Sequence, residues 1–300
     1  MDGVSDFHAG FACFVGRPNA GKSTLTNALV GTKIAITSSK PQTTRHTVRG
    51  IVNRPDSQLI LVDTPGLHKP RTLLGERLND LVRTTWAEVD VVALCVPADE
   101  PVGRGDRFIA DEIAGLKKKN LIAVVTKTDL VEKKRLAEQL LAVSQLAEFA
   151  EIVPVSAKSG EQVELLADLL TKYLPESPPL YPDGELTDEP EMVMVGELIR
   201  EAALEGVRDE LPHSLAVVVE EMEQREGRDD LLDVRATVFV ERPSQKAIVV
   251  GAGGERIKYV GSTSRRQIEA LLGTKVFLDL RVKVAKDWQR DPRQLRRLGF

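Results

Sequence analysis

In the first half of the chain, short apolar runs alternate with longer stretches in which apolar positions recur every three or four residues. The runs lie at residues 11–15, 59–62, 89–96, 121–125 and 152–155, each bounded by turn-forming residues. Residues 135–147 and 162–173 have the spacing of amphipathic helices. Near-continuous apolar strands with helices between them are typical of a parallel sheet covered on both faces. The pattern predicts an α/β domain over residues 1–174.

The pattern changes after residue 174. Five prolines fall within residues 175–190, a density that excludes a helix or a central strand, so this segment is predicted to be an extended linker. The remaining residues, 191–300, predict a smaller α+β domain. Its expected elements are a helix at 192–206, strands at 214–221 and 232–241, a glycine-punctuated helical region at 246–272 and a strand at 276–282.

Charge is distributed unevenly over a chain whose composition is that of an ordinary globular protein. The net charge is −4, yet residues 243–300 contain 13 Lys and Arg against 5 Asp and Glu, a net of +8. A compact basic end on an acidic chain is typical of a surface that binds polyanions, although a solvated charged surface has the same composition.

Several features of the sequence favour a cytoplasmic protein. Cys13 and Cys95 lie in apolar runs and are predicted to be buried, reduced thiols. The first residues lack the basic and apolar regions of a secretory signal. No run approaches the ~18 apolar residues of a membrane span.

A phosphate-binding loop is predicted at residues 16–23, which fit G-x-x-x-x-G-K-[ST] between an apolar strand and a helix. Backbone N–H groups of such a loop close around phosphate oxygens. Lys22 is expected to reach the β- and γ-phosphates and Ser23 to bind Mg²⁺. The phosphate-binding candidates are Gly16, Asn19, Ala20, Gly21, Lys22, Ser23, Thr24 and, from a later loop, Gly66.

Three further loops follow apolar runs and predict a guanine-nucleotide site. Asp63 follows the run at 59–62, where its carboxylate can hold Mg²⁺. Asp129 can accept two hydrogen bonds from the guanine edge, whereas adenine would leave this carboxylate unpaired. Loops at the carboxyl ends of parallel strands meet in one crevice. The guanine-binding candidates are Thr126, Lys127, Asp129, Ser156, Ala157 and Lys158.

With these motifs, the sequence resembles the translation-factor-like GTPases and, among them, the Era family of ribosome-assembly GTPases. Residues 40–46 look like the first switch of that family and residues 63–67 like the second, and the similarity extends to Phe300. The resemblance implies a P-loop GTPase domain with GTP or GDP and Mg²⁺. It also implies that Thr44, with Thr43 as the competitor, completes the metal ligands together with Ser23 and Asp63.

Two positions depart from common GTPase patterns. Thr126 stands where the family usually has the Asn of Asn-Lys-x-Asp, which predicts the loss of one of two hydrogen bonds to the phosphate loop and lower nucleotide affinity. Leu67 stands where many signalling GTPases have a water-orienting Gln, so unaided hydrolysis is predicted to be slow, and the sequence identifies no catalytic group. By resemblance, Asn19 either helps to hold K⁺ beside the phosphates or only shapes the loop.

The C-terminal domain looks like a KH domain of the bacterial type, because Gly251, Ala252, Gly253 and Gly254 form a G-x-x-G before a basic helix. Pattern alone favours a strand at 247–250, and the resemblance favours a helix. Ile248, Val250 and Ile257 either line an apolar groove for RNA bases or pack in the core of the domain.

The segment at residues 286–297 is basic. It either extends the RNA-binding surface or forms a docking tail, and for Trp288 we favour packing on the sheet. The RNA-binding candidates are Ile248, Val250, Gly251, Ala252, Gly253, Gly254, Arg256, Lys258, Arg265 and Arg266.

The leading prediction is a GTP-hydrolysing switch. The family resemblance implies that it binds small-subunit ribosomal RNA near the 3′ end and acts in assembly of the 30S subunit. It also implies a monomer, no binding to DNA, and peripheral inner-membrane association as an open option. The alternatives are an RNA-binding adaptor with a vestigial nucleotide site and, more remotely, a P-loop kinase.

Overall fold

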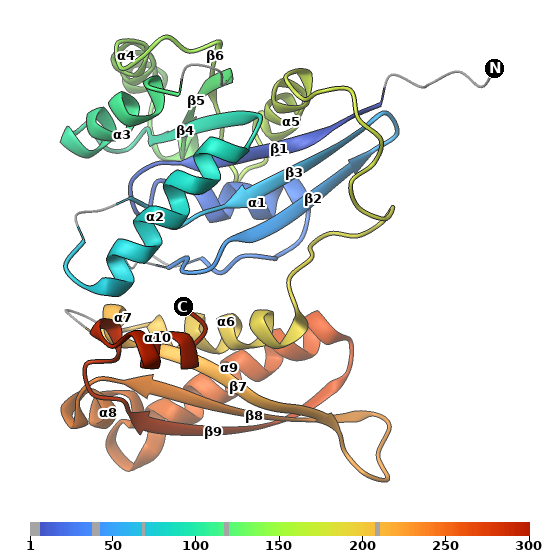
Figure 1. Ribbon diagram of the computed structural model, residues 1–300, viewed down its shortest axis with the longest axis vertical. Coiled ribbons are helices and arrows are strands. Elements are labelled where there is room, and N and C mark those ends of the chain that lie inside the picture. Colours follow the sequence, from blue (N-terminus) through green and yellow to red (C-terminus); the bar gives the residue numbers. More distant parts are fainter. Residues whose placement is uncertain (1–6, 38–42, 68–69, 117–119, 208–210) are drawn as a thin grey trace. The chain divides into compact units, whose positions relative to one another are not determined.

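The computed structural model describes residues 7–37, 43–67, 70–116, 120–207 and 211–300, and these form two compact units (Figure 1). The first unit comprises residues 1–35, 44–69 and 78–188, and the second comprises residues 36–43, 70–77 and 189–300. Residues 40–42 and 68, which belong to the predicted switches or adjoin them, lie outside the described residues.

The first unit is built on a six-stranded sheet in the order β2-β3-β1-β4-β5-β6. Its strands are β1 (His8–Val15), β2 (Val48–Arg54), β3 (Ser57–Asp63), β4 (Val91–Pro97), β5 (Asn120–Thr126) and β6 (Glu151–Pro154). All neighbours pair in parallel except β2, which is antiparallel to β3. The predicted parallel sheet is confirmed. The edge strand β2 was not predicted, because its half-exposed residues break the continuous apolar pattern of the other strands.

Helices cover both faces of this sheet, as predicted. They are α1 (Lys22–Val30), α2 (Leu73–Glu88), α3 (Arg104–Ala114), α4 (Lys133–Ser144) and α5 (Val163–Lys172), with a short turn of helix, η1, at Thr128–Leu130. Leu25 of α1 and Leu170 of α5 pack into one apolar cluster, whereas Val82, Ile109 and Val143 of α2, α3 and α4 pack into another. Alternate residues of β1 contribute to the two clusters. Both cysteines are buried free thiols.

The predicted linker is extended, and it lies against the first unit as far as residue 188. Gln58 of β3, which is 2% exposed, binds the backbone of the linker through both the oxygen and the nitrogen of its side-chain amide. Its Oε1 accepts hydrogen bonds from the backbone N–H groups of Leu180 and Tyr181, each at 2.8 Å. Its Nε2 donates to the Tyr181 carbonyl at 3.0 Å. The Ile51 N–H of β2 also donates to the Leu186 carbonyl, so this segment covers the otherwise free edge of the sheet.

The second unit has a three-stranded sheet in the order β7-β8-β9, in which β7 and β8 are antiparallel and β8 and β9 are parallel. Val195 and Ile199 of α6 and Val260 and Ile268 of α9 pack against one face of this sheet. Within the described ranges, no helix is long and apolar enough to cross a lipid bilayer. The elements are α6 (Glu191–Leu204), α7 (Leu211–Ser214), β7 (Ala216–Gln224), β8 (Leu231–Val240), α8 (Pro243–Val250), η2 (Ala252–Gly254), α9 (Glu255–Leu272), β9 (Lys275–Val284), η3 (Trp288–Arg290) and α10 (Pro292–Arg297).

Residues 247–250 belong to helix α8, so the family resemblance was right and the strand pattern was wrong. Pro243 opens the helix, a position where its fixed φ and missing N–H are favourable. Of the apolar run, Val249 is fully buried whereas Ile248 is 53% exposed. A helix turns neighbouring side chains in different directions, which explains how an apolar run this short can be only partly buried.

We predict that Gln58→Ala lowers the free energy of unfolding by about 1–3 kcal/mol, because it removes the partners of two backbone N–H groups and one carbonyl. Urea denaturation measures this change. Limited proteolysis is expected to cut residues 176–188 faster in the variant. Arg54→Ala is the control, since the ion pairs of Arg54 within the described ranges are with the exposed Glu164 and Asp168. This variant is expected to change stability by less than about 1 kcal/mol. Equal stability and proteolysis of Gln58→Ala and the parent would contradict the prediction.

Candidate functional site

The predicted phosphate-binding loop joins β1 to α1. A side chain at Gly16 would place its Cβ 2.6 Å from the Cys95 carbonyl oxygen, and Gly21 has φ +88°, so both positions require glycine. The Lys22 ammonium donates to the carbonyls of Gly16 at 3.2 Å and Arg17 at 3.0 Å. Lys22 is 6% exposed and therefore lies inside the loop whose backbone surrounds it.

The three predicted metal ligands come together beside this loop. The Ser23 hydroxyl donates to Asp63 Oδ2 at 2.7 Å, and the Thr44 hydroxyl donates to the same oxygen at 3.2 Å. The two hydroxyl oxygens lie 3.0 Å apart. Asp63 is fully buried, and its Oδ1 has no hydrogen-bond partner in the described part of the chain. Hard oxygen ligands and an unsatisfied buried carboxylate oxygen fit Mg²⁺.

Burial dominates the electrostatics of the pair formed by Lys22 and Asp63. It raises the pKa of the Asp63 carboxyl, against the hydrogen bond from Ser23 and the charge of Lys22, which lower it. Burial likewise lowers the pKa of the Lys22 ammonium, against the charge of Asp63. Each charged form is therefore incompletely stabilised by the protein alone, as is expected where a bound anion and a cation supply the remaining charge.

The loop after β3 approaches the phosphate-binding loop closely. A Cβ at Gly66 would lie 2.9 Å from the Pro18 nitrogen, so only glycine lets the two backbones come this near. Leu67 is 7% exposed and packs in the core of the first unit. It therefore presents no polar group that could orient water.

The base-recognition residues lie after β5 and β6. The Thr126 hydroxyl donates to the Ala20 carbonyl at 2.8 Å, so the hydroxyl keeps one connection between this strand and the phosphate-binding loop. Asp129 lies in η1, where its Oδ1 accepts from the Ser156 hydroxyl at 2.7 Å. Ala157 and Lys158 follow Ser156 in the turn after β6. The carboxylate of Asp129 is thus held in place, and its side chain is exposed to a ligand.

Arg17 of the phosphate-binding loop forms two ion pairs that the sequence did not predict. Arg17 Nε donates to Asp106 Oδ1 at 2.8 Å, and Arg17 Nη1 donates to Glu100 Oε2 at 3.1 Å. Asp106 is fully buried, and its other oxygen accepts from the Gly103 N–H at the start of α3. No motif connects residues this far apart in the chain, so the sequence offers no signal for the contact.

In the second unit, the G-x-x-G lies between α8 and α9 with a backbone that needs its glycines. Gly253 and Gly254 have φ +57° and +79°. No atom lies within 4 Å of a Cβ built on Gly253. Ile248 is exposed beside the loop, whereas Ile257 packs partly against the core. The exposed glycine backbone and an exposed apolar side chain therefore lie at the same end of the unit.

Arg256, one of the RNA-binding candidates, contacts the end of helix α6. Its Nη2 donates to the carbonyls of Ala203 at 3.0 Å and Glu205 at 2.5 Å, at the C-terminal end of α6. A cation at this end stabilises unsatisfied helix carbonyls, which gives Arg256 a structural role, and its contact with RNA stays a prediction. Lys258 and Arg266 are exposed, whereas Arg265 lies 3.9 Å from Glu269 in an ion pair.

Comparison with known proteins gives matches over the whole chain. A family model described as a 50S ribosome-binding GTPase matches residues 11–127, and a KH domain model matches residues 210–289. The chain is 73% identical to GTPase Era of Streptomyces coelicolor, over 97% of this chain and 95% of that protein. It is 66% identical to GTPase Era of Mycolicibacterium smegmatis, over 99% and 100% of the two chains.

Two solved structures share both units. The crystal structure of Era in complex with MgGDPNP and nucleotides 1506–1542 of 16S ribosomal RNA has a TM-score of 0.94 at 35% identity, covering 98% of this chain and 99% of that one. A variant of Aquifex aeolicus Era bound to GDP·AlF₄⁻ has a TM-score of 0.94 at 34% identity, with the same coverage of both chains.

We predict that Thr126→Val lowers the affinity for GTP and GDP alike, about 5- to 10-fold, because it leaves the buried Ala20 carbonyl without its donor at a cost of about 1–1.5 kcal/mol. Titration with a fluorescent GDP analogue, and competition with GTP, measure both affinities. Thr126→Ser retains the hydroxyl and is expected to bind like the parent. If the Val variant also binds like the parent, the connection to Ala20 does not support nucleotide binding.

Proposed function

The chain belongs to the Era family of GTPases, and from this membership we propose that it binds the 3′-end region of small-subunit ribosomal RNA and acts in assembly of the 30S subunit. The observation that carries the proposal is the presence, in one chain, of a complete GTP site and an exposed G-x-x-G loop. A relative with the same two units is an Era bound to MgGDPNP and to nucleotides 1506–1542 of 16S ribosomal RNA.

In the GTPase unit, we assign the phosphates to the backbone of residues 16–21 and to Lys22, and guanine to Asp129. Ser23, Thr44 and Asp63 would hold Mg²⁺, which neutralises charge on the β- and γ-phosphate oxygens. Because Ser156 occupies Asp129 Oδ1, the free lone pairs of the carboxylate are available to the two N–H donors of guanine. Leu67 offers no group for the attacking water, so we expect slow unaided turnover.

In the KH unit, we assign the RNA backbone to the Gly251–Gly254 loop and to the exposed Lys258 and Arg266. Glycines without side chains allow phosphates to approach the loop, and Ile248 offers an apolar surface to an unstacked base. A vestigial nucleotide site is disfavoured by the contacts among Ser23, Thr44 and Asp63. The cytoplasmic location and the monomeric state stay predictions from the sequence, and peripheral membrane association stays an open option.

We predict that Ala252→Asp combined with Gly253→Asp weakens binding of a 16S 3′-end RNA about tenfold or more at 0.1 M salt, because two carboxylates then face the phosphates. Filter binding measures this, and GTP hydrolysis by the same protein is expected to be unchanged. Gly227→Asp combined with Gly273→Asp is the matched control, because it adds the same two carboxylates at positions that also have a positive φ and open space, away from this loop. Parent-like binding by the double variant would move the RNA surface elsewhere.

We also propose that Asn19 contributes to a K⁺ site beside the phosphates. Asn19 has φ +63° within the phosphate-binding loop, a conformation that Asn tolerates better than most residues. A cation there would supply the charge that an arginine finger supplies in other GTPases. The alternative is that Asn19 only shapes the loop.

We predict that K⁺ raises the rate of GTP hydrolysis about tenfold or more over Na⁺ at matched ionic strength. Asn19→Ala is expected to remove the difference between the two salts while leaving GDP affinity within a few-fold of the parent. Single-turnover hydrolysis in both salts measures the effect. Equal parent rates in K⁺ and Na⁺ would exclude the site.

A further inference from the structure

We propose that the C-terminal tail, residues 285–300, is a second RNA-backbone contact surface, on the face of the KH sheet opposite the helices that carry the G-x-x-G loop. The inference rests on the proposed RNA-binding function and adds a separate surface to it. It explains two sets of observations together: a firmly packed tail, and basic side chains on that tail for which the described part of the fold offers no acidic partners.

The tail lies on the face of the sheet that α6, α8 and α9 leave open. Along β8, Val234, Ala236, Val238 and Val240 face the core shared with these helices. Phe239 points the other way, because successive side chains of a strand alternate between faces. The guanidinium of Arg297 in α10 lies 5.8 Å from the centre of the Phe239 ring, which places the tail on this second face.

Apolar contacts fix the tail in place. Trp288 is fully buried, donates from its indole N–H to the Ser214 carbonyl at 2.9 Å, and stacks on Phe300 with ring centres 5.6 Å apart. Leu295 is fully buried and Leu298 is 5% exposed. The tail is therefore a docked element of the unit, and the preference for packing of Trp288 was right.

The opposite side of the docked tail is basic and exposed. Five of its exposed cations have no ion pair to a described residue: Arg297, which lies over the Phe239 ring, and Lys286, Arg290, Arg293 and Arg296. Leu295 and Leu298 occupy the inward side of α10, and Arg297 lies over Phe239, whereas Arg293 and Arg296 are exposed. Side chains three and four positions apart on a helix lie about 5–6 Å apart, so these arginines form one charged strip.

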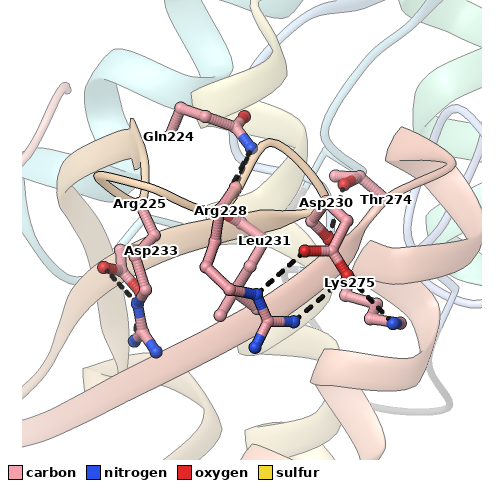
Figure 2. A network of polar contacts seen from close by, with 8 residues as sticks. All are labelled: Gln224, Arg225, Arg228, Asp230, Leu231, Asp233, Thr274 and Lys275. Carbon is pink, nitrogen blue, oxygen red and sulfur yellow. Dashed lines mark hydrogen bonds and ion pairs between the residues drawn. The ribbon is translucent and has the colours of Figure 1, made fainter.

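The cations of strands β7–β9, unlike those of the tail, have acidic partners. Each of the six Lys and Arg residues on β7–β9 and in the β7–β8 turn lies within 4.0 Å of a carboxylate (Figure 2 shows those at the turn). The pairs are Arg225–Asp233, Arg228–Asp230, Arg235–Glu221, Lys275–Asp230, Arg281–Asp279 and Lys283–Glu220. The sheet thus neutralises its own cations, and the tail does not.

Local helix stability does not explain the tail's charges. Like charges three or four positions apart destabilise a helix by about 0.2–0.5 kcal/mol per pair. Arg293 stands in the first turn of α10, where the helix dipole disfavours a cation. Only Arg296 and Arg297, in the last turn, are favourably placed with respect to the dipole. A polyanionic ligand would compensate for this repulsion.

The composition of the strip favours nucleic acid over a lipid membrane. Membrane-surface helices insert an exposed apolar face, and here Trp288, Leu295 and Leu298 are already buried. Four of the five tail cations without an ion pair are arginines, whose planar guanidinium binds phosphate through two N–H donors. A KH loop clamps about four nucleotides, whereas the RNA in the related Era complex covers nucleotides 1506–1542. Such an RNA has length to spare for a second surface.

The test uses the full chain and two RNAs, one equivalent to 16S nucleotides 1506–1542 and a six-nucleotide single strand from the same region. The tail variant carries Lys286→Gln, Arg290→Gln, Arg293→Gln and Arg296→Gln. The control variant carries Arg228→Gln, Arg235→Gln, Lys275→Gln and Arg281→Gln, which changes the net charge equally at positions that are already paired. Dissociation constants are measured over a range of KCl concentrations, with GTP hydrolysis as the check on folding.

We expect the tail variant to bind the long RNA more weakly, with a salt slope that falls by about 0.7 for each phosphate that the tail no longer neutralises. If two phosphates are left without their cations, the affinity falls about 25-fold at 0.1 M salt. Binding of the six-nucleotide strand by this variant and its GTP hydrolysis are expected to match the parent. The control variant is expected to keep most of its affinity for the long RNA.

Three results would overturn the inference. Equal decreases in affinity for the tail and control variants would show that only net charge matters. Parent-like binding by the tail variant, while Ala252→Asp with Gly253→Asp abolishes binding, would reject the tail and leave the proposed function intact. If the tail variant bound the long RNA like the parent but lost the parent's binding to phosphatidylserine vesicles, the tail would be assigned to a membrane. A parent that binds neither RNA would reject the proposed function, and the tail inference with it.

Discussion

The buried Asp63 carboxylate is the group on which the proposed GTP site depends. It has no access to solvent, and its described partners are two hydroxyl groups on one oxygen and the nearby charge of Lys22. A buried charge without full hydrogen bonding is costly, which is why burial raises the pKa of this carboxyl. A cation at Asp63 and phosphates at Lys22 would remove that cost. Nucleotide binding and the local stability of these loops are therefore thermodynamically linked.

A site of this kind works only if the loop around Lys22 keeps its shape without a ligand. Three contacts on different sides of the loop provide this: Thr126 on the Ala20 carbonyl, Arg17 on Asp106, and the close packing of Gly16 on the backbone of β4. Each attaches the loop to an element of the first unit's core. The backbone N–H groups are then held in place before phosphate arrives, so less conformational entropy is lost on binding.

The parts of the site that were predictable have local signals. An apolar run followed by Gly, Asp or Thr identifies the end of a buried strand, and parallel strands bring such ends together. That reasoning selected Asp63, Asp129 and the phosphate-binding loop as candidates from residue order alone, and the structure places each of them at or just after the end of a buried strand. The structure adds contacts that leave no periodic trace, such as Arg17 with Asp106 and Gln58 with the linker backbone. Residues 247–250 were ambiguous because a run of four apolar residues fits a strand or one turn of a helix.

The net charge of the second unit could be counted from the sequence, but the count does not show which cations are paired with acidic residues. The excess of basic residues over 243–300 indicated a polyanion surface, but the count includes Lys275, Arg281 and Lys283, which the sheet already neutralises. In the described part of the second unit, exposed cations without an ion pair lie on the helices that flank the G-x-x-G loop, such as Lys258 and Arg266, and on the tail, which is on the other face of the three-stranded sheet. An RNA that contacts both has to pass round an edge of that sheet, which a chain of four nucleotides cannot do. Two separated surfaces therefore select RNA by its length and path, in addition to the sequence read beside the loop.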